Sequence, residues 1–505
     1  MTQPQVSWRE ALEAMVHPRV LGMLFLGFSA GIPILLIFSS LSLWLLEAGV
    51  ERASITFFSW AALGYSFKFV WAPLVDQLPL PLLTRWLGRR RGWLLLSQLA
   101  IMLSIIAMAM TDPKAGSLIT MAIAAVALGF SSATQDIVID AYRIEAASLR
   151  LQSLLSSAYI AGYRIAMVVA GAGALYLAAG FGSTMEQYVY SAWQKTYWLM
   201  AMTMLLGVLT TLVIAEPETS QQRSYHHSAS TYLRFLLVFA LSAITFAACF
   251  YLSGGLFQAL KASTADPLLG FVFAVIRLVL AIAVALLVAK SCILLGLVQQ
   301  QMLDETYKAP VADFFSRYGL KTACLLLLLV GTYRISDIIL GVISNVFYAD
   351  IGFSKEQIAL AVKTFGVVMA IAGGFLGGVL SMRFGVLRIL FLGALLAALT
   401  NLLFLWLAAE PVLWLMYTVV AADNLCAGLA GAAFVAFLSG LTNVSFSAMQ
   451  YAIFSSVMTL LPKLLAGYSG SIVDSLGYSQ FFIITALLGV PVLLLVVLAG
   501  KRSIK

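Results

Sequence analysis

Long apolar runs separated by short polar breaks recur along the whole chain. Most of the runs approach or exceed the roughly 20 apolar residues that a helix needs to cross the hydrocarbon core of a bilayer. The pattern predicts an all-α polytopic membrane protein with fourteen spans, at approximately 20–46, 54–76, 92–111, 117–142, 153–180, 195–215, 232–258, 268–298, 320–348, 357–381, 386–409, 412–440, 448–474 and 479–500.

Two longer polar stretches divide these spans into groups. We expect residues 1–216 to form a six-helix bundle and residues 320–505 to form a second one. Between them, residues 217–231 are predicted to be a cytoplasmic linker and residues 299–319 a cytoplasmic connector. These stretches bracket residues 232–298, which are predicted to form two extra transmembrane helices.

Basic residues distinguish the two sides of the membrane. If the N-terminus is cytoplasmic, the outside connections hold only Arg52, Lys114, Lys195, Lys261 and Lys355. The other basic residues of the connections, including the run Arg89–Arg91, then lie inside. Because cytoplasmic loops carry an excess of Lys and Arg, this bias predicts that both termini are cytoplasmic. The net charge of +8 therefore marks topology and anionic lipid headgroups, and we expect no nucleic-acid partner.

Composition agrees with a membrane protein. A typical soluble domain is about half apolar and about a quarter charged, whereas this chain is 62% hydrophobic and 10% charged, with a mean hydropathy of +0.98. The four cysteines fall inside apolar spans and the three histidines fall outside them. We therefore expect no disulfide framework, no metal site, no cofactor and no catalytic set, so the chain is not predicted to be an enzyme.

The two sets of six spans resemble each other. The fourth span of the first set carries Gln135-Asp136, and its counterpart carries Asp423-Asn424. The fifth spans carry Arg164 and Lys463, each followed by a glycine seven residues later, and the second spans carry single lysines, Lys68 and Lys363. Such a repeat suggests two parallel halves, as in transporters that work by alternating access.

Two carboxylates at the end of the fourth span are the most informative charges. A charged side chain in hydrocarbon costs a few kcal/mol or more, so it must face protein or water and have a partner. Asp136 and Asp140 are four residues apart and share one helix face. Lys68 lies at the same depth as Asp136 and could pair with it. We expect Asp136 to be a protonatable coupling group and Asp140, nearer the cytoplasm, to belong to an inner gate.

The remaining intramembrane charges predict a central cavity that is richer in cations than in anions, which suits a substrate with carboxylates or phosphates. Its expected substrate-binding residues are Gln135, Lys68, Tyr65, Tyr163, Arg164, Arg334, Lys363, Asp423, Asn424 and Lys463. The expected gate residues are Asp76, Asp140, Arg143, Arg89 and Arg90. The alternative is that the charges pair within the bundle and only hold helices together, with Asp337 neutralising Arg334 along one helix face.

Several segments spread over the chain resemble the AmpG family of muropeptide permeases, within the major facilitator superfamily. They include 27–33 (GFSAGIP), 67–76 (FKFVWAPLVD), 88–93 (GRRRGW), 132–141 (SATQDIVIDA), 162–164 (GYR), 363–366 (KTFG) and 443–452 (NVSFSAMQYA). The superfamily's loop signature after the second span is stretched here between Asp76 and Arg91.

The resemblance implies a major facilitator fold with two extra helices, in the inner (cytoplasmic) membrane of a bacterium. It implies import of anhydromuropeptides, chiefly N-acetylglucosaminyl-1,6-anhydro-N-acetylmuramyl peptides, driven by the proton motive force. It also implies roles in cell-wall recycling and in β-lactamase induction, and transport roles for Gln135 and Asp136. We expect an anionic sugar-peptide, protons and membrane lipid as partners, with the monomer as the functional form. A eukaryotic acetyl-CoA transporter family shares parts of the pattern, so another anionic solute such as acetyl-CoA is the alternative substrate.

Overall fold

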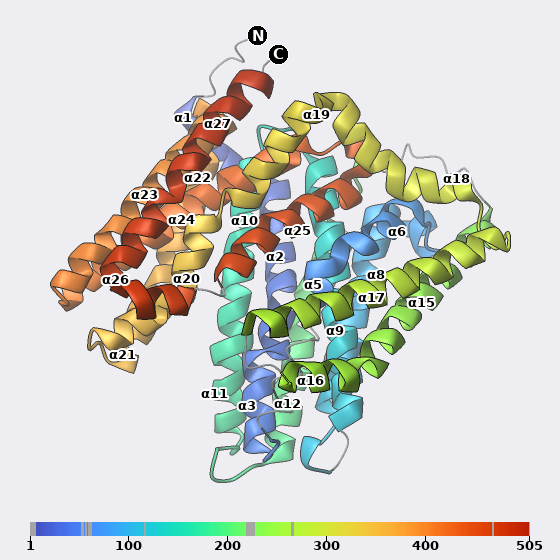
Figure 1. The fold of residues 1–505 in the computed structure, drawn as a ribbon, viewed down its shortest axis with the longest axis horizontal. Helices are drawn as coiled ribbons and strands as arrows, with labels where there is room; N and C mark the ends of the chain where they lie inside the picture. Colours follow the sequence, from blue (N-terminus) through green and yellow to red (C-terminus); the bar gives the residue numbers. More distant parts are fainter. Residues whose placement is uncertain are drawn as a thin grey trace. The chain divides into compact units, whose positions relative to one another are not determined.

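The computed structural model describes residues 7–51, 55, 58, 63–115, 118–218, 228–263, 267–466 and 469–503. These residues form helices joined by short connections (Figure 1), so the prediction of an all-α fold is confirmed. The chain divides into two compact units. The first comprises Met1–Asp76, Leu80–Gln222 and Phe314–Lys505, and the second comprises Gln77–Pro79 and Arg223–Asp313.

The described part of the N-terminal half of the first unit consists of helices, several of them joined by short 3₁₀ or π segments. They begin with the short α1 (Trp8–Glu13) and a 3₁₀ turn at Ala14–Val16, and continue with α2 (Pro18–Ile37) with α3 (Ser39–Glu47), α5 (Leu63–Phe67) with η3 (Lys68–Val70) and α6 (Ala72–Gln77), α7 (Leu83–Leu87) with α8 (Arg89–Ala109), η4 (Pro113–Ala115) with α9 (Leu118–Ala146), α10 (Gln152–Val168) with η5 (Val169–Gly173) and α11 (Ala174–Gly180), and α12 (Tyr190–Thr203) with α13 (Leu205–Val213).

The C-terminal half of the first unit repeats this plan. Its helices are α19 (Ala309–Thr332), whose first residues belong to the second unit, with α20 (Ile335–Asp350), α21 (Lys355–Ile358) with η7 (Ala359–Phe365) and α22 (Gly366–Phe384), α23 (Val386–Ala409), α24 (Leu413–Leu441), η8 (Val444–Phe446) with α25 (Ser447–Ala466), and α26 (Ser469–Leu487) with α27 (Gly489–Ser503). Non-helical backbone at Gly319 and Gly477, both with positive φ, divides α19 and α26.

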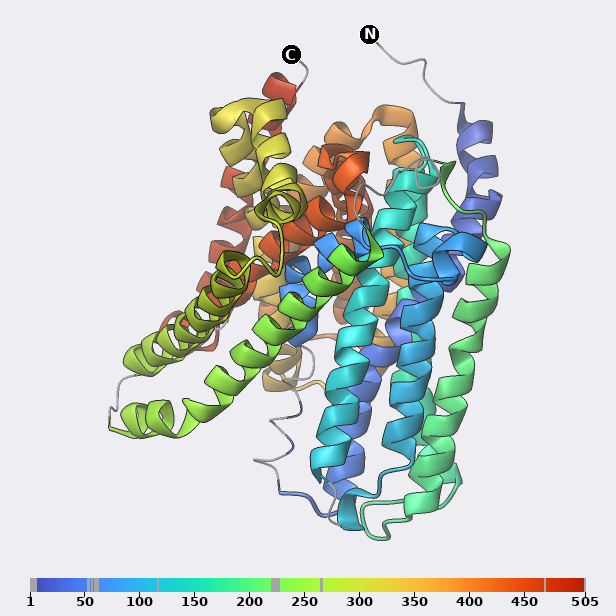
Figure 2. The ribbon, with the colours of Figure 1, turned by 90° about the vertical axis from the view of Figure 1, so that its right-hand side faces the viewer.

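The second unit contains the two predicted extra helices. Its elements are α15 (Ala229–Leu252), α16 (Gly254–Ala262), α17 (Pro267–Leu294), α18 (Gln300–Leu303) and η6 (Asp304–Lys308). Helices α15 and α17 lie side by side (Figure 2). Arg277 of α17 donates to the carbonyl oxygen of Phe250, with a distance of 3.0 Å from its Nε. The larger part of the predicted linker 217–231 falls outside the described residues.

Twelve helices of the described part are long and apolar enough to cross a membrane, so the chain is a multi-pass membrane protein. Two of the fourteen predicted spans are not among these twelve. Span 54–76 includes residues outside the described part and is divided into α5, η3 and α6. Span 448–474 appears as a shorter apolar helix, Val444–Leu460. The structure is consistent with fourteen spans without fixing that number.

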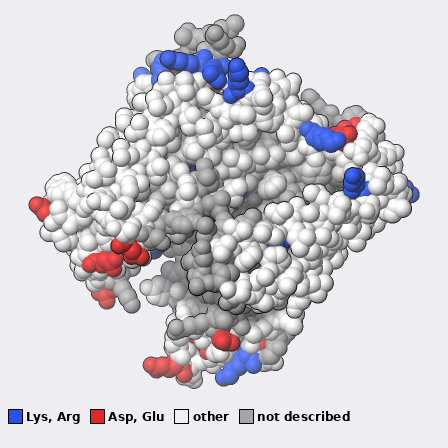
Figure 3. All heavy atoms as spheres, in the orientation of Figure 1, with Lys and Arg blue, Asp and Glu red and all other residues white. Residues whose placement is uncertain are grey.

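Charged side chains lie mainly at the ends of the first unit. In Figure 3, Lys and Arg gather at the end where α1 and the last turn of α27 lie, and a surface with few charged side chains separates this end from the opposite one. We call the end that carries Arg89–Arg91, Arg143 and Arg383 the basic end. It is the side that the charge pattern predicts to be cytoplasmic.

Glycines allow helices to pack backbone against backbone within each half. A Cβ on Gly162 of α10 would overlap the carbonyl oxygen of Leu24 in α2. In the C-terminal half, a Cβ on Gly428 of α24 would overlap the carbonyl oxygen of Ala370 in α22. Small residues permit this close approach of membrane helices, which associate by van der Waals packing rather than by the hydrophobic effect.

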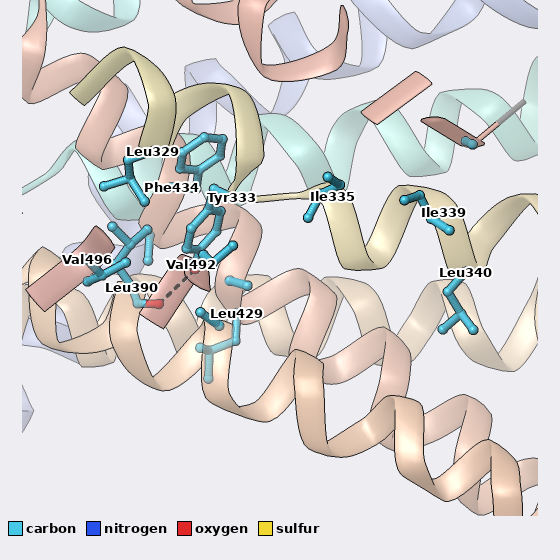
Figure 4. Packing of buried hydrophobic residues seen from close by; sticks show 14 of the residues in the cluster. Leu329, Tyr333, Ile335, Ile339, Leu340, Leu390, Leu429, Phe434, Val492 and Val496 are labelled. Carbon is cyan, nitrogen blue, oxygen red and sulfur yellow. Dashed lines mark hydrogen bonds between the residues drawn. The ribbon is translucent and has the colours of Figure 1, made fainter. Parts of the chain in front are cut away.

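The aromatic core of the C-terminal half fixes the break between α19 and α20. The ring of Tyr333 stacks on Phe434, with 4.4 Å between centroids. Its hydroxyl donates to the carbonyl oxygen of Leu390 at 2.9 Å (Figure 4). The break at Tyr333 is therefore held by packing and by a hydrogen bond, which gives the adjacent Arg334 a defined position.

We predict that Gly428→Ala lowers the thermal stability of the purified protein, whereas Gly431→Ala does not. The first change forces α22 and α24 apart, and overpacking of a tight contact costs about 1–3 kcal/mol. Gly431 lies in the same helix with nothing within 4 Å of an added Cβ, so the better helix propensity of Ala leaves stability unchanged or raised. Unfolding temperatures in detergent measure both, and equal values for the two variants would contradict the packing argument.

Candidate functional site

Charged residues of the predicted cavity lie where membrane helices depart from regular α geometry. Lys68 opens the 3₁₀ segment between α5 and α6, and Arg334 precedes the first residue of α20. Lys363 lies in a π-helical segment before α22. Irregular helices are common at functional sites, and in transporters such breaks line the substrate pathway.

The first cluster of charges surrounds the two carboxylates of α9. Lys68 Nζ lies 3.4 Å from Asp140 Oδ2, and Arg143 Nη2 lies 3.3 Å from Asp140 Oδ1. Asp136 accepts a hydrogen bond of 3.3 Å from the Tyr159 hydroxyl. The ion pair formed by Lys68 is thus with Asp140, one turn from the partner that we expected, and Lys68 acts on Asp136 only through its field.

The polar neighbours of this cluster are a buried amide, that of Gln135, and a group of partly exposed tyrosines. Gln135 is fully buried, and its Oε1 accepts a hydrogen bond of 2.9 Å from Ser29 of α2. In this conformation Gln135 joins two helices of the N-terminal half. Tyr65 donates to Ser132 at 2.5 Å, and the rings of Tyr159 and Tyr163 lie 6.0 Å apart. The side chains of Tyr65, Tyr159 and Tyr163 are all partly exposed, as a surface that binds a sugar requires.

The second cluster brings together charges from both halves. Arg334 Nε lies 3.6 Å from Asp337 Oδ2. Asp423 of α24 interacts electrostatically with both residues. Arg164 of α10, in the other half, is exposed and is repelled by the positive charge of Arg334. An anion placed between two such guanidinium groups would remove this repulsion.

Three other predicted cavity residues have different surroundings. Asn424 donates to the carbonyl oxygen of Val420 at 2.9 Å, so its amide is engaged within α24. Lys363 is exposed. The side chain of Lys463 lies outside the described part of the chain. Among the described residues, no group of three or more His, Cys, Asp or Glu is arranged to hold a metal ion.

The predicted gate residues form a buried network at the basic end. Arg90 Nη2 lies 2.7 Å from Asp76 Oδ1 and 2.5 Å from Glu145 Oε1. Arg89 lies 3.3 Å from the same Glu145 oxygen and donates to the carbonyl oxygen of Asp76. Glu216 accepts from the backbone N–H groups of Arg90 and Arg91, at 2.7 and 2.9 Å. These contacts fix the first turn of α8, where a carboxylate is favourable.

The same network joins the two halves. Asp76 accepts hydrogen bonds from the backbone N–H groups of Ala448 and Met449, in the first turn of α25. Ser447 of α25 donates to Glu145 and accepts from Arg90. A carboxylate at a helix N-terminus is favourable because the helix dipole is positive there. The basic end is therefore closed by charge, by hydrogen bonds and by a helix dipole.

A second layer of contacts between the halves lies deeper. Arg143, which is 1% exposed, donates to Ser156 at 3.0 Å and to Ser439 of α24 at 2.8 Å. Ser157 of α10 donates to the carbonyl oxygen of Gly374 in α22 at 2.6 Å.

The sequence reasoning did not identify Glu145, Tyr159 or the serines of these contacts. Glu145 was missed because the predicted fourth span ended at residue 142, whereas α9 continues to Ala146. The available signal was its spacing, because Glu145 lies five residues after Asp140 and two after Arg143. The serines carried no signal, because their roles depend on contacts between distant helices.

Family models match both halves of the chain. One described as the Major Facilitator Superfamily matches residues 323–503, and one described as Acetyl-coenzyme A transporter 1 matches residues 20–216. Among solved structures, the proton:xylose symporter XylE bound to 6-bromo-6-deoxy-D-glucose covers 97% of this chain and 95% of its own, with a TM-score of 0.59 and 14% identity. This likeness shows the fold.

Curated relatives match over nearly the whole length. The Putative transporter AmpG 4 of Rickettsia felis is 29% identical over 96% of this chain and 97% of its own. An uncharacterized protein of Haemophilus influenzae is 30% identical over 92% and 91%, respectively. The Anhydromuropeptide permease of Escherichia coli K12 is 28% identical over 97% and 81%. With the fold and the two charged halves described above, these matches show that the chain belongs to the AmpG family of transporters in the major facilitator superfamily.

Proposed function

We propose that this protein imports anhydromuropeptides, chiefly N-acetylglucosaminyl-1,6-anhydro-N-acetylmuramyl peptides, from the periplasm to the cytoplasm by alternating access. The process would be driven by the proton motive force and would serve cell-wall recycling, with an indirect effect on β-lactamase induction. The protein would lie in the bacterial inner membrane with both termini in the cytoplasm and would act as a monomer without enzymatic activity.

The observation that carries this proposal is the pair Arg164 and Arg334. The two guanidinium groups come from different halves and repel each other, so a ligand with carboxylates would bind between them and bring the halves together. Muropeptides carry free carboxylates and sugar hydroxyls. The near full-length similarity to a protein named anhydromuropeptide permease supports the same substrate class.

The phenols near Asp136 supply the sugar side of the proposed site. Tyr65, Tyr159 and Tyr163 cluster on the N-terminal half, whereas Arg334, Asp337 and Asp423 lie on the C-terminal half. Aromatic rings offer flat faces to sugar rings, and hydroxyl groups offer hydrogen bonds. We therefore assign the disaccharide to the phenols and the peptide carboxylates to the two arginines.

Under this proposal the structure faces the periplasm. The basic end, which the charge pattern assigns to the cytoplasm, is closed by Arg90 with Asp76, Glu145 and the first turn of α25. Import then requires this gate to open and the opposite end to close. Arg89, Asp140 and Arg143 are proposed to take part in the same gate.

Acetyl-CoA is the second candidate substrate, because an acetyl-CoA transporter family model matches residues 20–216. The phosphates of acetyl-CoA would suit Arg164 and Arg334. However, the acetyl-CoA transporter model matches only the N-terminal half, whereas Arg334 belongs to the C-terminal half. Competition distinguishes the two: excess acetyl-CoA should leave the uptake of labelled anhydromuropeptide into proteoliposomes unchanged. Uptake of acetyl-CoA in preference to the muropeptide would overturn the proposed substrate.

We predict that Arg164→Ala and Arg334→Ala each reduce uptake of a labelled anhydromuramyl tripeptide by about tenfold or more. A hydrogen bond to a charged group contributes about 1.5–3 kcal/mol, and 1.4 kcal/mol corresponds to a factor of about ten. The same tripeptide substrate with its peptide carboxyl groups amidated should be affected less, because it lacks those negative charges. Arg277→Ala is the control, because Arg277 binds a carbonyl group within the second unit. Equal losses for the two substrates would contradict the assignment of the arginines to the peptide.

We predict that Asp136→Asn abolishes uphill uptake while leaving substrate exchange across the membrane. Asp136 is a buried carboxylate of α9 in the electrostatic field of Lys68, so a proton bound there would change the charge of the cluster. An uncoupler should stop uptake by the unmodified protein. Full uptake by the Asn variant would exclude Asp136 as the coupling group, and uptake that survives the uncoupler would exclude proton coupling altogether.

A further inference from the structure

A cluster of uncharged polar side chains lies in the interior of the N-terminal half, where four helices meet. Thr211 of α13 donates to Gln98 Oε1 of α8 at 2.9 Å, and Ser29 of α2 donates to Gln135 Oε1 of α9 at 2.9 Å. All four residues are completely buried. Each hydrogen bond joins two helices, so one holds α13 to α8 and the other holds α2 to α9.

Each glutamine of this cluster has one end of its amide without a partner. Among the protein atoms of the described residues, Nε2 of Gln98 and Nε2 of Gln135 have no hydrogen bond. This result does not depend on how the amide is turned, because a turned amide would bring its oxygen to the same position. A buried polar group without a partner costs free energy, and in native proteins nearly all such groups are satisfied by protein or by ordered water. The two glutamines therefore need a further partner.

Gly207 of α13 brings the two hydrogen-bonded pairs together. A Cβ at this position would overlap Ser29 Oγ and would lie 3.2 Å from Gln98 Nε2. Since both atoms lie within 3.2 Å of one point, a water molecule with hydrogen bonds of about 2.8–3.0 Å can span them. Ser29 uses its proton on Gln135, so its oxygen can accept. A buried water typically makes about three hydrogen bonds, and Gln135 Nε2, on the amide that Ser29 binds, provides the third.

The C-terminal half repeats this arrangement. Its third span, α23, carries a buried amide at Asn401, whose Nδ2 donates to Ser336 of α20 at 3.1 Å. Ser336 in turn donates to the carbonyl oxygen of Thr485 in α26. In both halves an amide of the third span thus lies near a serine of the first span and a threonine of the sixth. Among the described residues, Asn401 Oδ1 is again a buried atom without a protein partner. The recurrence with different side chains indicates that the unpartnered atom is a feature of the fold.

We propose that a buried water molecule occupies the N-terminal cluster, bound by Gln98, Ser29 and Gln135. The water accepts from Nε2 of both glutamines and donates to the serine hydroxyl. The hydrogen bonds then run without interruption from Thr211 to Gln135, across α13, α8, α2 and α9. Because Gln135 directly precedes Asp136, the same chain fixes the turn of α9 that carries this carboxylate. The amide of the C-terminal cluster binds a second water at the equivalent place.

Such a chain gives the N-terminal half a property that alternating access needs. The two halves of such transporters move largely as rigid bodies. In a bilayer the hydrophobic effect does not hold helices together, so they associate by close packing and by hydrogen bonds between helices. A buried polar network that is fully satisfied makes the elements that it joins more rigid. The water thus makes α2, α8, α9 and α13 move as one body.

The first test is a density map of the unmodified protein at a resolution that shows ordered waters. The expected result is a peak within about 3.2 Å of both Gln98 Nε2 and Ser29 Oγ, with a second peak beside Asn401 Oδ1. Ordered waters elsewhere in the interior, with none beside Gln98, would overturn the proposal. A peak as strong as that of a bound halide ion would overturn the assignment to water.

Gln98→Met tests the same site through stability. If the water satisfies the amide, the substitution interrupts the chain and lowers the unfolding temperature in detergent by about 2–4 °C. If the amide has no partner, an apolar side chain of similar size leaves this temperature unchanged or raises it, which would contradict the proposal. Gln135→Met should cost much less in the Gln98→Met background than alone, because both substitutions remove the same water.

Asn401→Leu is the matched control, because it removes a buried amide from the other half. Its effect on the unfolding temperature should add to that of Gln98→Met. Simple additivity of Gln98→Met with Gln135→Met would instead overturn the shared water. The map needs no variant, so it decides the question if Gln98→Met does not fold. These measurements use no substrate, so a failure of muropeptide import leaves their result intact.

Discussion

The structure depends on the position of Arg90 between Asp76 and Glu145, completely shielded from solvent. A buried charge without partners costs several kcal/mol, so each member of this set is needed by the others. The set is completed from the other half, because the first turn of α25 supplies the backbone donors and Ser447 supplies a hydroxyl. The closed basic end is therefore a property of both halves together.

Hydropathy and charge predicted the fold because a membrane restricts what a chain can do. Every backbone polar group in hydrocarbon must be satisfied, so apolar runs of sufficient length must be helices. Counting the apolar runs on either side of the two long polar stretches gave the two sets of six spans and the two extra helices between them. The breaks at Lys68 and Arg334 could not be predicted, because an interrupted helix there is stabilised by tertiary contacts, such as those of Tyr333 with Phe434 and Leu390.

The candidate site was predictable in its residue types but not in its pairings. Depth along the helix correctly brought Lys68 near the carboxylates of α9, but it favoured Asp136 as the partner, one turn from Asp140, with which Lys68 pairs. The choice depends on how α5 and η3 approach α9. Gln135 shows the same limit: the sequence predicted it to bind substrate, and only the packing of α2 against α9 gives Ser29 as its hydrogen-bond partner.

Alternating access sets an upper bound on how strongly the gate can hold. Two states that both occur in a transport cycle differ by a few kcal/mol, and a ligand shifts them only by its difference in affinity. A network as large as that of Arg90 satisfies this bound because desolvation offsets most of its Coulomb attraction. Its net contribution is then close to that of one or two ordinary interactions. A substrate that binds one state more tightly by a few kcal/mol is therefore sufficient to reverse the balance between a closed and an open basic end.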